Sequence, residues 1–124
     1  MKMMSPPTAW ALVTVAVAVA IASDAAQASS AFDGGWSVRI ITNRGACDPD
    51  SSFGVEIRDG NVYGSGGIPV HGRVAGNGAV TVSVASGQRS ANGSGRLSGN
   101  SGGGTWRGVG SQGACSGRWS ASRQ

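Results

Sequence analysis

Three arginines near the end of the chain, Arg96, Arg107 and Arg118, are the residues whose type and placement could do chemistry. A guanidinium forms paired hydrogen bonds with phosphate, sulfate or carboxylate groups. If the fold places the three side chains on one face, they form an anion-binding strip. If that face is only solvated, the same arginines keep a small protein soluble, and the sequence leaves both interpretations open.

The charged residues are unevenly distributed along the chain, whose net charge is +4. From residue 29 onward all carboxylates lie at or before Asp59, whereas the charged residues after it are all arginines. The second part of the chain therefore forms a positive surface suited to anionic partners. Because the protein is expected to be exported, we expect an anionic glycan or lipid, or an acidic protein, rather than nucleic acid.

The expectation of export rests on residues 1–28, which have the pattern of a signal peptide. Lys2 precedes an apolar run over about residues 9–22, and Ala26-Gln27-Ala28 matches a cleavage site. The run is shorter than the 18 or more residues of a membrane span. We expect a secreted or periplasmic protein, with a retained interfacial anchor as the alternative. Residues 29–124 then form one small domain, expected to be a monomer.

Two cysteines, Cys47 and Cys115, are expected to form a disulfide, because cysteine pairs in exported proteins are usually oxidised. The bridge closes a loop of roughly seventy residues and contributes about 4 kcal/mol in the chain-entropy model. A small domain this rich in glycine depends strongly on such a link.

Groups for catalysis or metal binding are scarce. His71 is the single histidine, and its alternation with Val70 and Gly72 predicts an outward-facing side chain. Without a second histidine or a free cysteine, a metal site of the usual kind lacks ligands. Asp48 and Asp50 flank a proline in a loop, where turn chemistry accounts for them as well as a calcium site would. We therefore expect no catalytic activity, no metal and no cofactor.

Alternating apolar and polar residues predict a fold built from strands alone. Turn residues separate eight segments, over residues 36–42, 53–58, 61–65, 70–75, 79–85, 89–97, 104–109 and 115–122. Short strands joined by tight turns favour a small antiparallel meander barrel, with a β-sandwich as the alternative. In a closed meander the first strand lies beside the last, so the disulfide joins the two ends of the sheet.

We expect tight turns centred at Ser101-Gly102 and Gln112-Gly113, and these turns set which residues of the last three strands lie opposite one another. Trp106 then lies opposite Leu97 and Trp119, while the three arginines form a row on the other face. Glycines flank the large residues, as expected for side chains that fill a narrow barrel. Three Gly-x-Trp repeats are accordingly interpreted as core, with a carbohydrate-stacking platform as the alternative.

The same reasoning extends to the preceding strands. A turn at Ser86-Gly87 pairs Val82 with Ala91, and the loop around Asn77 pairs Val74 with Val80.

The chain resembles a group of small exported proteins from soil alphaproteobacteria of the Bradyrhizobium type. The likeness lies in Phe32-Asp-Gly-Gly-Trp-Ser-Val, Gly45-Ala-Cys-Asp48, Gly93-Ser-Gly-Arg-Leu-Ser-Gly99, Gly104-Thr-Trp-Arg-Gly108 and Cys115-Ser-Gly-Arg-Trp-Ser-Ala121. The resemblance implies export, a disulfide and a β fold. Some members carry haem-utilisation labels, which an outward-facing His71 does not support. A weaker likeness is to small eight-stranded periplasmic barrels that inhibit proteases or lysozymes.

Three functions follow as hypotheses. The first is a binding module for anionic envelope or extracellular glycan or lipid, using Arg96, Arg107 and Arg118. The second is an inhibitor of a secreted hydrolase, acting through the loop 44–52 or the segment before Phe32. The third is a structural secreted protein without a specific ligand.

Overall fold

The computed structural model describes residues 14, 16 and 31–124 of the 124-residue chain. The expected signal peptide falls almost wholly outside these residues. In the described part, no helix has the length and apolar character needed to cross a membrane. The elements are β1 (Gly34–Arg44), β2 (Asp50–Arg58), β3 (Asn61–Gly64), the 3-10 turn η1 (Ser65–Gly67), β4 (Val70–Val74), β5 (Ala79–Ser86), β6 (Arg89–Ser98), β7 (Ser101–Gly110) and β8 (Gly113–Arg123).

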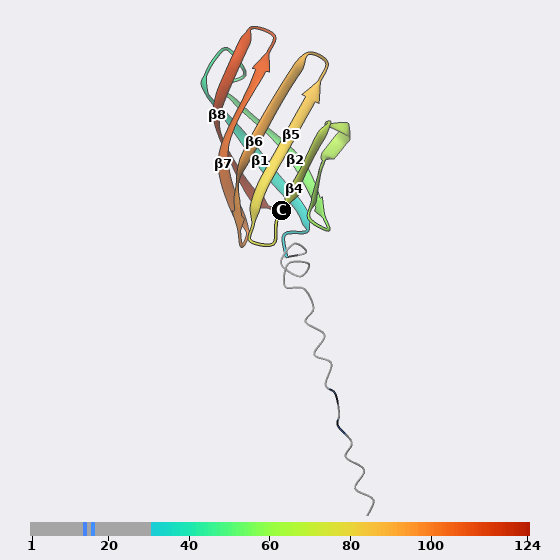
Figure 1. The fold of residues 1–124 in the computed structure, drawn as a ribbon. Coiled ribbons are helices and arrows are strands. Elements are labelled where there is room, and N and C mark those ends of the chain that lie inside the picture. The colour runs from blue at the N-terminus through green and yellow to red at the C-terminus, as the bar shows by residue number, and fades with distance from the viewer. Residues whose placement is uncertain (1–13, 15, 17–30) are drawn as a thin grey trace, which may run out of the picture.

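The eight strands form a closed antiparallel barrel in which each strand pairs with its neighbours in sequence (Figure 1). Closure comes from β1 and β8, which pair from Trp36–Arg123 to Arg44–Ser116. This confirms the expected meander barrel and excludes the sandwich alternative. Asp59 and Gly60 form the two-residue turn between β2 and β3, since Arg58 pairs with Asn61.

The disulfide between Cys47 and Cys115 is confirmed, and it joins residues 68 positions apart. Cys47 lies in the loop after β1, and Cys115 lies on β8. Because β1 and β8 are paired, the bridge fastens the closing seam of the barrel, as the meander topology predicts.

The expected strand registers are only partly correct. The pairing of Val74 with Val80 is confirmed. Val82 instead lies opposite Gly93, and Trp106 lies opposite Gly93 and Gly117 rather than opposite Leu97 and Trp119. Each error is an even number of residues, so every side chain keeps its expected face.

The turns explain the errors on either side of β6. Ser86 pairs with Arg89 and Ser98 pairs with Ser101, so the two-residue loops begin at Gly87 and Gly99. Both glycines have positive φ, at 63° and 61°. A glycine in the first loop position is what a type II′ hairpin turn requires, and this requirement sets the register.

The inward side chains form a single core that contains Trp36 and Trp119, which are 1% and 8% exposed. Trp106 is partly buried and packs against it. The interpretation of the Gly-x-Trp repeats as core is therefore confirmed.

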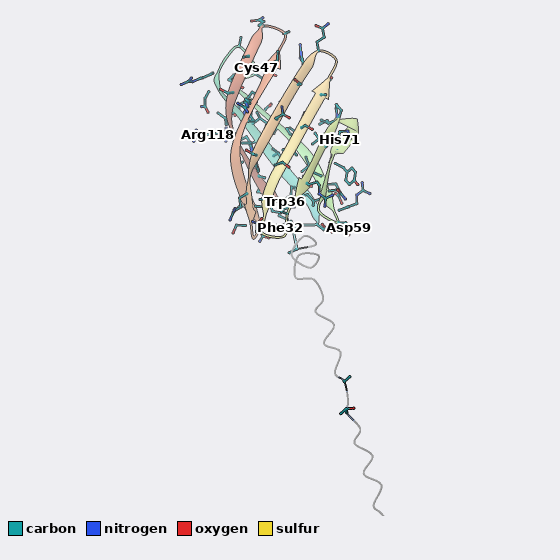
Figure 2. All side chains as sticks on the ribbon, in the orientation of Figure 1. Phe32, Trp36, Cys47, Asp59, His71 and Arg118 are labelled. Carbon is teal, nitrogen blue, oxygen red and sulfur yellow. A yellow bond between two sulfur atoms is a disulfide. The ribbon has the colours of Figure 1, made fainter. Side chains whose placement is uncertain are left out.

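One end of the barrel is closed by contacts between the two ends of the described domain. The indole Nε1–H of Trp36 donates to the carbonyl of Phe32 at 2.8 Å. Arg123 donates to the carbonyls of Asp33 and Ala31 at 2.7 and 2.8 Å, and its guanidinium lies 4.7 Å from the Trp36 ring centroid. Figure 2 shows Phe32 and Trp36 at this end and Cys47 at the opposite, upper end.

Two inward glycines on β6 differ in the space around them, and this difference is testable. A Cβ on Gly93 would make ordinary contacts of 3.4 Å or more, whereas one on Gly95 would meet the carbonyl of Gly103 and lie 2.7 Å from Trp119. We expect Gly95→Ala to lower the free energy of unfolding by about 2 kcal/mol through overpacking. Gly93→Ala should be neutral or stabilise by about 0.5 kcal/mol. Urea unfolding of both variants checks this, and equal losses would contradict it.

Candidate functional site

An apolar cavity of about 240 Å³ lies inside the barrel. Residues from all eight strands line it, among them Trp36 near the closed end and Leu97, Val82 and Trp119 along the wall. The alternating large and very small side chains of the interior were expected to fill a narrow barrel. They leave part of it open, and valine is the most frequent residue in the wall.

The cavity offers no free hydrogen-bonding side chain in the part of the chain that the structure describes. The indole N–H groups of Trp106 and Trp119 donate to the carbonyls of Ile41 and Ser94, each at 3.1 Å. Asn92 contributes to the wall, but it alternates with the inward Ala91 and Gly93 and is exposed on the outer face. The interior therefore suits an apolar occupant.

A second hollow of about 400 Å³ lies at the disulfide end of the barrel. It shares Ile40, Val84, Ala91 and Trp106 with the apolar cavity, so the two hollows adjoin at these four residues. The lining here is mixed in character, with Thr42, Ser51, Asp48 and Arg89 as polar members and both cysteines in the wall. The barrel is thus a cup, closed at Trp36 and polar at its mouth.

Arg89 is the arginine that the strand alternation directs to the mouth of this cup. It is the first residue of β6 and shares the inward register of Ala91 and Gly93. Its cross-strand partner is Ser86, which has the inward register of Val84. In the sequence, Arg89 is one of several arginines in a segment without carboxylates. Its place at the mouth depends on the position of the turn between β5 and β6.

The outer-face arginines Arg96, Arg107 and Arg118 are all exposed, as expected. The predicted row is wrong, however: Arg96 pairs with Ala79 and Gly103, Arg107 with Asn92 and Ser116, and Arg118 with Thr105 and Ile41. The true register removes direct like-charge pairs across the sheet, which destabilise it.

A different group of arginines gathers on the outer face of β7, β8 and β1. Arg107 and Arg44 both pair with Ser116, one from each side, so their Cα atoms lie about 10 Å apart. Arg118 is diagonal to Arg107. We call Arg44, Arg107 and Arg118 the outer arginine cluster; Arg96 lies about four residues further along the sheet and does not belong to it.

Arg39, on the same face, is occupied by a carboxylate. Its Nε and Nη2 donate to the two carboxylate oxygens of Asp50 at 3.0 and 2.6 Å. The contact between Arg39 and Asp50 is the one ion pair among the residues that the structure describes. The hydrogen bond from Arg39 lowers the pKa of Asp50, and the bond to Asp50 raises the pKa of Arg39.

This pair predicts a small pH dependence of stability. Because the pKa of Asp50 is lower in the folded chain, its contribution is present above the unfolded-state pKa and is lost as the pH falls through the folded-state pKa. Arg39→Gln should raise the pKa of Asp50 toward its ordinary value, as followed by carboxyl ¹³C NMR. Arg73→Gln is the control, since Arg73 bonds to the neutral Asn61. An unchanged Asp50 titration in Arg39→Gln would contradict the assignment.

His71 is exposed on β4, between Tyr63 and Ser83 on the neighbouring strands. The expected outward direction is confirmed. Asp48 and Asp50 lie around the loop after β1, and in residues 31–124 no three metal-ligating side chains gather into a site.

Comparison of the chain with protein-family models, with curated proteins and with solved structures finds no match.

Proposed function

We propose that this barrel binds a small apolar molecule in its interior. The observation that carries the proposal is the cavity of about 240 Å³, whose tryptophan N–H groups are already bonded to backbone carbonyls. Eight-stranded barrels are wide enough to hold either packed side chains or one small ligand. Here the side chains leave the space open.

The size of the cavity argues against a simple packing defect. At about 24 cal/mol per Å³, an enclosed empty cavity of this volume forfeits at most about 6 kcal/mol relative to a filled core. Small domains have total stabilities of about 5–15 kcal/mol, so this cost is large. Water does not fill it well, because a buried water needs two to four polar partners. An apolar ligand recovers the lost contacts.

The architecture also supplies an entrance. The closed end is fixed by Trp36 and Arg123, whereas the other end leads into the polar hollow past Ala91 and Trp106. A ligand therefore enters from the disulfide end. Ala91 lines both hollows, so a large side chain at this position should obstruct the passage.

The test is binding of the neutral fluorescent probe N-phenyl-1-naphthylamine to the purified, oxidised protein. We expect saturable binding, with fluorescence transfer from the interior tryptophans, and a loss of affinity of at least about ten-fold in Ala91→Phe. Ser94→Phe is the matched control, because Ser94 lies on the outer face of the same strand and is exposed. Failure of the probe to bind, or equal binding by the two folded variants, would refute interior binding.

The outer arginine cluster supports a second candidate function, binding of an anionic glycan or lipid surface. Arg44, Arg107 and Arg118 are exposed, and none of them forms an ion pair within residues 31–124. Charge-assisted contacts from several arginines suit a polyanion and weaken with salt. This candidate replaces the straight arginine row with a group that the observed register brings together.

Binding to lipopolysaccharide and to an acidic polysaccharide across a salt series tests this candidate. Changing Arg44, Arg107 and Arg118 together to serine should weaken salt-sensitive binding by about ten-fold or more. Changing Arg73 and Arg96 to serine is the control, since both are exposed outside the cluster. Equal losses in the two variants would indicate a nonspecific effect of net charge.

A further inference from the structure

We infer that the ligand of the barrel is a single-chain amphipathic molecule whose anionic head group lies beside Arg89. This inference rests on the proposed function and specifies its ligand class. The head group is of the carboxylate or phosphate kind, and the tail is aliphatic.

The first support is that the barrel interior has two zones in series. The lower cavity offers apolar walls, and the adjoining hollow at the mouth carries hydroxyl and charged side chains. The zones meet at Ile40, Val84, Ala91 and Trp106. A wholly apolar ligand uses only the lower zone, whereas an aliphatic chain with a polar head matches both.

The second support is the charge at the mouth. Arg89 lines the upper hollow and has no ion pair within residues 31–124. Ser86, the cross-strand partner of Arg89, lines the hollow beside it and adds a hydroxyl donor. A guanidinium with a neighbouring hydroxyl is a suitable site for a carboxylate or phosphate.

The acidic residue of this hollow does not neutralise Arg89. Asp48 belongs to the loop between β1 and β2, whereas Arg89 begins β6, on a different part of the barrel circumference. The backbone of Asp48 is held there, because its carbonyl accepts a hydrogen bond from the Thr42 hydroxyl. The net charge of +4 on the whole chain further favours the approach of an anion.

The dimensions favour a chain of medium length. The inward residues from Leu97 to Ala91 on β6 span about 20 Å along the strand, or roughly 15 Å along the axis of a barrel with ordinary strand tilt. The tail therefore lies along the axis, with its end near Trp36 and its head at the mouth.

The experiment compares decanoate, decyl phosphate and 1-decanol as competitors of bound N-phenyl-1-naphthylamine, all below their aggregation concentrations. We expect decanoate or decyl phosphate to bind about ten-fold more tightly than the alcohol at low salt. Whichever anion is preferred identifies the head group. Arg89→Gln should abolish the preference, so that the anions bind no more tightly than 1-decanol does. Arg96→Gln, an exposed arginine on the outer face of the same strand, should change neither affinity.

The outcomes separate this inference from the proposed function. If 1-decanol displaces the probe as well as the anions do, or if the anion preference survives in Arg89→Gln, the head-group site is refuted and interior binding stands. If the probe binds but none of the three competitors displaces it, the head-group site is refuted and interior binding stands. If the probe itself does not bind, both are refuted.

Discussion

Trp36→Ala is expected to lower the free energy of unfolding by about 4 kcal/mol, which is among the largest losses for a single substitution in this domain. Trp36 is 1% exposed and lines the closed end of the cavity. Alanine removes the indole that seals this end, and on the cavity side no side chain is in place to fill the space. Urea unfolding, monitored by the circular dichroism of the sheet, measures the loss.

Trp36→Phe distinguishes the contribution of the buried ring from that of its hydrogen bond. Phenylalanine keeps most of the apolar volume but loses the hydrogen bond to the carbonyl of Phe32. The expected loss is about 1 kcal/mol. If Trp36→Phe costs as much as Trp36→Ala, the hydrogen bond and not the packing holds the closed end. If Trp36→Ala costs less than about 1 kcal/mol, Trp36 does not act as the seal.

The strands and their faces were predictable because side-chain direction alternates with a period of two. The alternation of Val80, Val82 and Val84 with polar residues survives any even error in register. The order of the strands in the sheet was predictable for a different reason: strands linked by tight turns pair in sequence order. Closure then placed β1 beside β8 and the two cysteines at one seam.

The register depended on Gly87 and Gly99, because Gly87 was expected second in its turn and Gly99 was expected outside the next turn, at Ser101-Gly102. Centring the β5–β6 turn on Ser86-Gly87 put the glycine second, whereas the structure puts Gly87 first, with φ of 63°. The rule that a type II′ turn takes glycine at its first central position was available from the sequence. Its use at Gly99-Asn100 would have placed Arg96 opposite Gly103 and so separated Arg96 from Arg107.

The cavity was not predictable from the sequence, because its existence depends on the volume enclosed by closure. Alternating tryptophan and glycine layers describe a filled barrel as well as a hollow one. The difference lies in how Trp106 and Trp119 are held, with their N–H groups directed to Ile41 and Ser94 on the wall. Such tertiary hydrogen bonds leave no periodic signal.

The role of Arg123 was also invisible in the sequence. It was grouped with the positive residues of the second half, yet its guanidinium caps the closed end over Trp36. Two of its partners are backbone carbonyls before β1, which the pairing of β8 with β1 brings near, and the third is the side-chain oxygen of Asn100. Arg123 therefore packs over the buried Trp36 and bonds to the chain before β1, although it belongs to the positively charged part of the sequence.

Replacing Cys47 and Cys115 together by serine is expected to lower the free energy of unfolding by about 4 kcal/mol. The bridge spans 68 residues, and in the chain-entropy model a loop of this length loses about that much denatured-state entropy when it is closed. A loss of this size brings a small domain close to unfolding at room temperature. Urea unfolding of the double variant and of the reduced wild-type protein should give the same midpoint.

The origin of this stabilisation can be tested separately from its size. The two cysteines lie at the seam between β1 and β8, and neither belongs to the residue pairs of the two strands. The bridge therefore acts mainly on the unfolded chain, and its removal should increase the denaturant m-value because the unfolded chain exposes more surface. An unchanged m-value with weakened β1–β8 amide protection in the folded state would show that the bridge instead holds the seam itself. In that case probe binding should weaken as well, because both cysteines line the mouth of the cup.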